Sequence, residues 1–482
     1  MIRAPISLPR LTPIRGAALF ALITQFFVGC TVGPDASRPA LPTPPPGSFI
    51  NATPTTSTPV MSAWWQQIDD PLFDQFVTSL LSDNLSLQES RERVVQARQR
   101  LAIQSGQSDG RLPTLSAEAG ATRGFTPTPA APTNPDRLYA DHFTADLNVS
   151  WTFDLFGRLS RSIESSEASY LSVQAEREAL THPLIAELLN RRVSIAINAR
   201  LLELARQNVA NREALSQQVR RRYDLGTSGT ALADAYLASD NVTTVQSDVA
   251  EFERLLTADL YRLDLLLGQP PGTTQLEPSA FPLLAPPASP PTSLPADLLD
   301  RRPDLRASEL RARAATANVG VAIADRYPQV TLGGRLGVAD PSISNLFSSD
   351  QLAGSLLANI SQRLFAGGTL RANLRLQESA ARELATRYAA DVLDALREVE
   401  STLQADQSLA TQLAAQDSSL AALRAAETLS ESRYRNGIQN LTTFLDTQQR
   451  RYRTEQTWLL TPQLRWNTRI SLYLALGGDW TN

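Results

Sequence analysis

The sequence predicts a mainly α-helical fold with a smaller β part, built as two copies of one long unit. Hydrophobic residues make up 42% of the 482 residues and aromatic residues only 6%, which favours helices lined by small and aliphatic side chains. Two pairs of segments instead alternate apolar and polar residues, as strands do. Three landmarks recur, at offsets of 215, 209 and 211 residues: Pro113 with Pro328, Phe156 with Phe365, and Gly226 with Gly437. Nearly constant offsets indicate a tandem duplication.

The first 29 residues have the pattern of a secretory signal. Arg3, Arg10 and Arg15 precede an apolar run from Ala17 to Val28, and no acidic residue occurs before that run ends. A basic start followed by a short apolar run is typical of export signals, and this run is too short for an ordinary membrane-spanning helix. We therefore predict a signal peptide over residues 1–29.

The one cysteine of the chain, Cys30, follows this signal directly. A single cysteine cannot form an internal disulfide. The preceding residues, "FVGC", resemble a lipobox, although Phe27 stands where leucine is commonest. That resemblance implies cleavage before Cys30 and a diacylglyceryl group on its thiol, and Thr31 in place of aspartate implies sorting to the outer membrane. The alternative is an ordinary signal peptide with an incidental cysteine.

Two proline-rich stretches divide the rest of the chain. Residues 30–60 are rich in Pro and Thr, so we expect a lipidated, extended tether that does not join a core. Residues 269–297 form a second proline-rich segment, which we interpret as a connector. The first repeat then covers 61–268 and the second 298–482.

Each repeat contains two predicted strands, at about 112–126 and 141–156 in the first and about 327–339 and 351–365 in the second. The clearest alternation places these apolar residues on one face: Phe143, Ala145, Leu147, Val149, Trp151, Phe153 and Leu155. One apolar and one polar face suit either a half-buried soluble sheet or a membrane barrel with lipid outside and water inside. Export favours the barrel. Because four strands cannot close around a channel and an open edge is costly in lipid, several chains must share one barrel, and three would supply twelve strands.

Long helices follow each strand pair, from Leu159 to about Tyr223 and from Leu370 to about Arg435. Their length is typical of coiled coils, and Asn84 is a plausible cap for a shorter helix before the first strand. Pro183 predicts a kink or a restart. Both long helices end at a glycine, Gly226 or Gly437, which predicts hairpin turns.

The composition argues against two other classes of protein. The net charge is −4, without the basic patches of nucleic-acid binders, so we expect no nucleic-acid partner. The two histidines, His142 and His182, do not have the spacing of a zinc site, and the chain contains no P-loop or dinucleotide fingerprint. We therefore expect neither an enzyme nor a cofactor or metal, apart from the lipid on Cys30.

Taken together, the chain resembles the TolC and NodT family of outer-membrane efflux factors from Cys30 to Trp480. The motifs that carry the resemblance are "CTVGPD" at Cys30, "RRPDLRASE" at Arg301, "IADRYPQVTLGG" at Ile323, "RYRNGIQNLTTFLDTQQ" at Arg433 and the closing "LYLALGGDW". The resemblance implies a homotrimer with a shared twelve-strand transmembrane β-barrel and a trimeric α-barrel that crosses the periplasm. It also implies a lipid-anchored protein of the outer membrane whose partners are a periplasmic adaptor and an RND-type inner-membrane pump.

The same resemblance assigns roles to particular residues. Tyr223 and Gly226 in the first tip, and Tyr434 and Gly437 in the second, match motifs that dock the adaptor. Asp446, nine residues after the second tip glycine, matches an acidic residue that closes the periplasmic mouth. Three copies would form a ring of like charge that favours cations. A second acidic position of some relatives is Thr443 here, which implies one acidic ring instead of two.

The function implied is a passive duct for drugs or other small organic compounds. With only two methionines and two histidines, the chain shows no cluster that favours metal ions. Type I protein secretion and metal efflux remain alternatives for such a duct. A periplasmic coiled-coil scaffold is the alternative outside the channel class, although scaffolds of that kind lack two pairs of long alternating strands.

Overall fold

The computed structural model describes residues 31–51, 64–108, 113–127, 137–226, 231–275, 277, 280–287 and 295–478. The predicted signal peptide and Cys30 lie outside these residues. The chain divides into two compact units. The sheet unit comprises the described parts of Met1–Pro39, Gln96–Leu171 and Glu309–Arg387, and the helical unit those of Ala40–Val95, Ser172–Ser308 and Tyr388–Asn482. Within the described part of the chain, none of the helices has an apolar stretch of the length that a membrane crossing requires.

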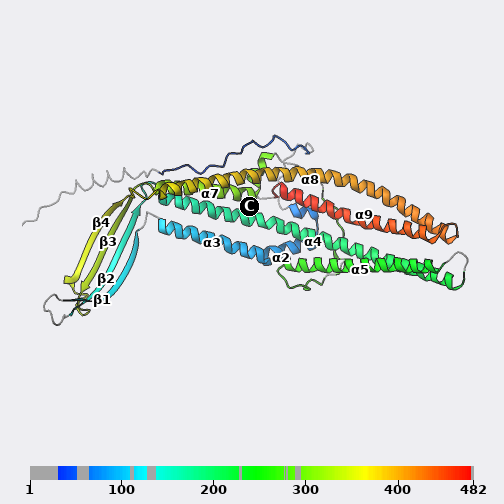
Figure 1. Cartoon of the computed structure of the whole chain (residues 1–482), viewed down its shortest axis with the longest axis horizontal. Helices are drawn as coiled ribbons and strands as arrows, with labels where there is room; N and C mark the ends of the chain where they lie inside the picture. Colours follow the sequence, from blue (N-terminus) through cyan, green and yellow to red (C-terminus); the bar gives the residue numbers. More distant parts are fainter. Residues whose placement is uncertain are drawn as a thin grey trace, which may run out of the picture. The chain divides into compact units, whose positions relative to one another are not determined.

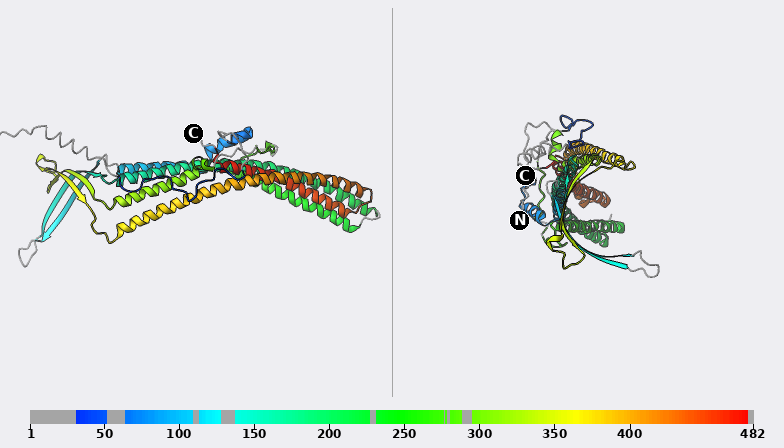
Figure 2. Two further views of the ribbon diagram at one scale, coloured as in Figure 1. Left: turned by 90° about the horizontal axis from the view of Figure 1, so that it is seen from above. Right: turned by 90° about the vertical axis from the view of Figure 1, so that its left-hand side faces the viewer.

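The sheet unit contains one antiparallel sheet of four strands in the order β1-β2-β3-β4 (Figure 1). The strands are β1 (Thr114–Pro127), β2 (Arg137–Phe153), β3 (Gln329–Asp340) and β4 (Leu352–Ser361). They lie within a few residues of the four segments expected from alternation. The pairing of β2 with β3, from Phe143 opposite Asp340 to Phe153 opposite Val330, joins the two repeats. The sheet is strongly curved (Figure 2).

Helices make up most of the remaining structure. They are α2 (Pro71–Asp83), α3 (Leu85–Ser108), α4 (Arg158–Asp224), α5 (Leu232–Leu266), α6 (Leu298–Arg301), α7 (Pro303–Ala324), α8 (Thr369–Arg435) and α9 (Leu441–Ala475), with short 3-10 turns at Trp64–Ile68, Pro295–Asp297 and Ser349–Gln351. Asn84 caps α3, because its Oδ1 accepts the N–H of Leu87 at 3.1 Å. In the helical unit, α4 with α5 and α8 with α9 form two hairpins that lie together (Figures 1 and 2).

Helix α4 runs without interruption through Pro183, so the expectation of a restart there is wrong. A proline removes one backbone hydrogen bond, but packing beside this site holds the helix. Ile185, Leu188 and Leu189 are completely buried in the main core of the helical unit. Helix α9 likewise continues through Pro462.

The main core of the helical unit lies where α2, α4 and α5 meet the connector and α9. Trp64 stacks on Tyr473 with ring centroids 5.2 Å apart. The buried indole of Trp466 donates to the carbonyl of Leu284 at 2.9 Å. The proline-rich connector is therefore fixed to the helices at this point through its own backbone.

Residues 31–51 pack along the two units, which corrects the expectation of a tether that stays apart from a core. In the sheet unit, the buried guanidinium of Arg161 donates to the carboxylate of Asp35 at 2.8 Å and to the carbonyl of Gly33 at 3.4 Å. In the helical unit, Phe49 is buried and the backbone N–H of Asn51 donates to Glu400 at 3.1 Å. Composition alone missed these contacts because a few polar anchors and one aromatic side chain supply them.

The motif "RRPDLRASE" has a structural role in the helical unit. Arg302 donates to both carboxylate oxygens of Asp304, at 3.1 and 2.8 Å, to Glu398 of α8 at 2.8 Å and to the carbonyl of Ala475 at 3.2 Å. Burial by itself lowers the pKa of Arg302, but the hydrogen bonds to the two carboxylates outweigh it and raise the pKa. The guanidinium therefore ties the start of α7 to α8 and to the end of α9.

We expect Arg302→Ala to lower the free energy of unfolding of the helical unit by about 2 kcal/mol, because hydrogen bonds to charged groups are lost and both carboxylates are partly exposed. Thermal unfolding of the detergent-solubilised protein, followed by circular dichroism, measures the change. Arg397→Ala is the matched control, since its ion pair with Asp394 is exposed and its loss leaves the midpoint unchanged. Equal midpoints for both variants would contradict the role given to Arg302.

Candidate functional site

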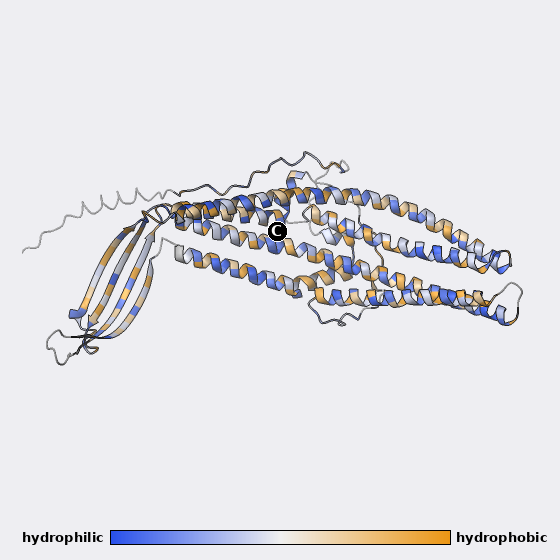
Figure 3. Cartoon of the chain, viewed as in Figure 1, coloured by the Kyte–Doolittle hydropathy of each residue, from blue (hydrophilic) through white to orange (hydrophobic). Residues whose placement is uncertain are grey.

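The strand register separates the sheet into an apolar and a polar face. Residues on the apolar face align across all four strands in two rows: Leu115, Val149, Gly334 and Leu356, and Ala117, Leu147, Leu336 and Gly354. The intervening rows contain Ser116, Asn148, Arg335 and Ser355, and Glu118, Asp146, Gly337 and Ala353. The alternation is visible along the strands in Figure 3. One face thus suits lipid and the other suits water.

An ion pair lies on the polar face. Arg335 donates to both carboxylate oxygens of Asp146, at 2.8 and 2.7 Å. Gly337 stands opposite Asp146 in the register, and a Cβ there would lie 1.8 Å from Asp146 Oδ1. The glycine therefore leaves the space that the carboxylate occupies.

Aromatic side chains lie near both ends of the strands. At one end, Trp151 and Phe153 have ring centroids 4.2 Å apart, and Phe156 stacks on Tyr327 at 4.7 Å. At the other end, the rings of Phe125 and Tyr139 are 6.1 Å apart. Aromatic girdles at both interfaces, separated by strands of about 9 to 11 residues or more, are a feature of membrane barrels.

The outer strands of the sheet, β1 and β4, have no further strand of the chain beside them within the described residues. Backbone N–H and C=O groups on an edge that faces lipid each cost several kcal/mol when they are unpaired. A sheet of this kind can enter a membrane when other copies pair with both edges.

The second part of the site is the pair of hairpin tips in the helical unit. Gly226 and Gly437 adopt φ of +65° and +70°, the left-handed conformation that favours glycine. At the second tip, the N–H of Ile438 donates to the carbonyl of Arg433 at 2.9 Å and that of Gly437 to Tyr434 at 3.1 Å. This pair of bonds is the Schellman motif, and it turns the chain from α8 toward α9.

The two tip tyrosines have different surroundings. Tyr434 is 8% exposed and belongs to a small core with Val219, Ala235 and Phe444, and its ring stacks on Phe444 at 5.5 Å. Burial raises the pKa of the Tyr434 hydroxyl, and the positive charge of Arg222 offsets only part of this rise. Tyr223 is half-buried, with the guanidinium of Arg220 5.8 Å from its ring.

Two aliphatic side chains beside the turn glycines are among the most exposed apolar residues described. Leu225, before Gly226, is 82% exposed, and Ile438, after Gly437, is 74% exposed. They were not predicted as site residues, although an apolar residue next to a turn glycine can be recognised in the sequence. They provide an apolar contact on each tip.

Asp446 lies on the exposed surface of α9, one turn from Arg450, and its carboxylate is 3.0 Å from the Arg450 guanidinium. A spacing of four residues allows ion pairs to form along a helix, so this pair could have been predicted from the sequence. Asp446 therefore has a partner within its own chain that balances part of its charge.

The histidines do not form a site in the described structure. His142 lies on β2 opposite Thr122, and His182 is buried in α4 near the ring of Trp65, with centroids 5.8 Å apart. Over the described ranges, we find no group of three or more His, Cys, Asp or Glu side chains arranged to hold a metal ion.

Comparisons with known proteins agree with this arrangement. The family described as "Outer membrane efflux protein" matches residues 77–269 and 294–478, two segments separated by the connector. The toluene efflux pump outer membrane protein TtgF of Pseudomonas putida is 28% identical over 94% of this chain and 95% of its own length. The cation efflux system protein CusC of Escherichia coli is 26% identical over 94% and 96%. The solved outer-membrane channel OprN is 29% identical, with a TM-score of 0.83 over 93% of this chain and 99% of its own.

The match of the family over most of the chain, the two-faced sheet and the likeness to a solved outer-membrane channel lead to one conclusion. The chain belongs to the outer membrane efflux protein family.

Proposed function

We propose that three copies of this chain form a passive duct that exports small organic compounds through the outer membrane. The observation that carries the proposal is the four-stranded sheet, with one apolar face, one polar face and two edges without partners in the described chain. Two copies would close a barrel of eight strands, whose interior side chains largely fill. Three copies would close twelve strands, which leaves room for an aqueous lumen lined by Asp146 and Arg335.

The beginning of the described chain supports a lipid anchor on Cys30. The N–H of Val32 donates to the carbonyl of Phe156 at 3.3 Å, and Thr31 fits against Gly157, where a Cβ would lie 2.8 Å from the Thr31 Cα. These contacts hold the residue after Cys30 beside the end of β2, near the aromatic pair of Phe156 and Tyr327. Acyl chains on Cys30 would enter the membrane beside the barrel that they help to anchor.

The hairpin tips are the proposed contact for a periplasmic adaptor, which joins the duct to an RND-type pump of the inner membrane. Gly226 and Gly437 have no side chain, and among the described residues, their immediate chain neighbours aside, no atom lies within 4 Å of the place that a Cβ would take, so the backbone of each turn is open to a partner. Leu225 and Ile438 add an exposed apolar contact. The buried ring of Tyr434 stabilises the second tip by packing against Phe444.

One feature of the chain bears on the substrate class, namely its low content of methionine and histidine. TtgF is named for toluene efflux and CusC for cation efflux, at similar identity to this chain. Each chain contains two methionines and two histidines in 482 residues, too few for a relay of soft metal ligands. We therefore favour organic compounds over metal ions.

Accumulation of a fluorescent organic dye in cells that lack their own outer-membrane channel tests this proposal. The chain is expressed together with genes for a periplasmic adaptor and an RND-type pump, and the dye and a copper salt are supplied in parallel. We expect expression to lower dye accumulation and to leave copper tolerance unchanged. Restored copper tolerance with unchanged dye accumulation would reject organic compounds and favour a metal duct.

The gate proposal for Asp446 includes Arg450, because the two side chains form an ion pair. In single-channel recordings, we expect Asp446→Asn to lower the ratio of cation to anion permeability by about twofold, and Arg450→Ala to raise it by about as much, since each exposed charge has a modest effect. Asp394→Asn, which removes an exposed carboxylate elsewhere on α8, is the control. If all three variants keep the permeability ratio of the unaltered protein, Asp446 is not part of the gate.

A further inference from the structure

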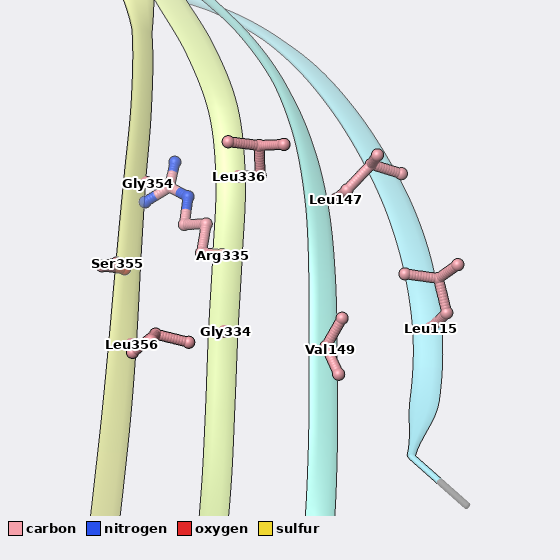
Figure 4. A pocket seen from close by; sticks show the side chains of 9 residues that line it. All are labelled: Leu115, Leu147, Val149, Gly334, Arg335, Leu336, Gly354, Ser355 and Leu356. Carbon is pink, nitrogen blue, oxygen red and sulfur yellow. The ribbon is translucent and has the colours of Figure 1, made fainter. Parts of the chain in front are cut away.

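The apolar face of the sheet contains a groove of about 600 Å³ that conduction through the lumen does not use. Most of its walls are aliphatic side chains from all four strands: Leu115, Leu147, Val149, Leu336 and Leu356 (Figure 4). Gly334, Gly354, Arg335 and Ser355 complete the lining. Leu356 is 94% exposed, so one wall of the groove is almost entirely available to a ligand.

Two glycines create this hollow. Gly334 lies between Val149 and Leu356 in its row, and Gly354 lies beside Leu336 in the next. Neither has a positive φ. A Cβ at Gly334 would lie 3.4 Å from Leu356 Cδ2, and one at Gly354 would lie 3.5 Å from Leu336 Cδ1, which are ordinary contact distances.

The backbone therefore does not require glycine at either position, in contrast to Gly337 on the polar face, where a Cβ would overlap Asp146. Side chains would fit at Gly334 and Gly354, and they would fill the groove. What the two glycines provide is a gap in an otherwise continuous apolar surface.

We propose that this groove binds one acyl chain of an outer-membrane lipid. The inference rests on the proposed function, in which the apolar face between the aromatic pairs contacts the membrane. The lining is mostly aliphatic, and the guanidinium of Arg335 is already paired with Asp146, so the groove offers a polar ligand little compensation for lost hydration. A gap beside lipid forfeits van der Waals contacts unless something fills it, and a flexible hydrocarbon chain contacted from three sides packs better there than one lying against a smooth surface.

Photolabelling of the membrane-reconstituted protein tests the proposal. The purified assembly is placed in vesicles of phosphatidylethanolamine and phosphatidylglycerol that contain a phospholipid with a diazirine in the middle of one acyl chain. After irradiation and trypsin cleavage, we expect labels to concentrate on the peptides Leu138–Arg158 and Leu336–Arg363, at the groove residues of each. Gly334→Leu and Gly354→Leu should each reduce that labelling about fivefold, the ratio expected when roughly ten carbon–carbon contacts are lost.

Ala121→Leu is the matched control, since Ala121 is exposed on the same face opposite Phe143 but outside the groove, and it should leave groove labelling unchanged. Labelling spread evenly over the apolar face and insensitive to both glycine substitutions would overturn the proposal. Labelling that appears only in Cys30→Ser would also overturn it, because that result would assign the groove to the chain's own lipid. Single-channel current retained by the glycine variants shows that the duct is intact, so a failed groove and a failed duct are distinguishable.

Discussion

Arg192→Ala is expected to lower the free energy of unfolding of the helical unit by about 3–5 kcal/mol, the range measured when one partner of a buried ion pair is removed. The Arg192 side chain is 1% exposed. Its Nε donates to Asp70 Oδ2 at 2.7 Å and its Nη1 to the carbonyl of Pro282 at 2.6 Å. The substitution would leave the Asp70 carboxylate and the Pro282 carbonyl buried without the hydrogen bonds that Arg192 donates to them.

Asp70 also caps α2, because its Oδ1 accepts the N–H groups of Leu72 and Phe73 at 3.1 and 3.3 Å. Asp70→Asn keeps an acceptor for this cap but leaves Arg192 without its counter-charge, so it separates the two roles. We expect it to destabilise the unit less than Asp70→Ala does. Denaturant unfolding of the solubilised protein, followed by circular dichroism, measures all three variants.

The control for this series is Arg200→Ala on the same helix. Arg200 pairs with Glu203 on the surface of α4, where an exposed ion pair contributes little, and its loss should not shift the unfolding midpoint. If Arg192→Ala unfolds at the same denaturant concentration as Arg200→Ala, Arg192 does not hold Asp70 and the connector to α4.

Tyr434→Ala should have the largest effect at the hairpin tips. Truncating a buried aromatic side chain costs about 3–5 kcal/mol, and the ring of Tyr434 stacks on Phe444 and contacts the core shared by the two hairpins. The loss is local, so we expect the amides around Gly437 to exchange with solvent about a hundredfold faster. Hydrogen–deuterium exchange with mass spectrometry of the tip peptides measures this.

Tyr223→Ala is the matched control at the other tip. The Tyr223 ring is half-buried, and its substitution should change the exchange of the first tip by far less. Tyr434→Phe keeps the stacked ring and should exchange like the unaltered protein. Unchanged protection in Tyr434→Ala would mean that the ring does not organise the tip, and a role in direct contact with the adaptor would then be the better interpretation of this residue.

The sequence predicted those parts of the fold that follow from local periodicity. Alternation over residues 143–155 is strict because each face of β2 meets a single environment, and the strand pairs were located from it. Gly226 and Gly437 marked the turns because few other residues adopt a positive φ. The outer-membrane location was predicted from the same alternation together with the expected signal peptide, which lies outside the described residues. The family was identified from motifs in order and spacing.

What could not be predicted depends on contacts between distant residues. Asp70 and Arg192 are separated by 122 positions, and neither stands in a recognisable motif. Pro183 was expected to interrupt α4 because proline removes a backbone hydrogen bond. The packing of Ile185 and Leu188, which holds the helix there, is not visible in the sequence. The packing of residues 31–51 depends on Arg161 and Glu400, which lie far along the chain. Tyr434 matched a docking motif, but only the structure shows that its ring is buried.

Native mass spectrometry of the protein extracted from outer membranes tests whether three chains share one membrane barrel. We predict one dominant species with three times the mass of the processed, lipid-bearing chain, which separates into single chains on heating. A dominant species of one or two chains in the folded, membrane-extracted protein would contradict the shared barrel, because four strands cannot close around a lumen and eight leave none open.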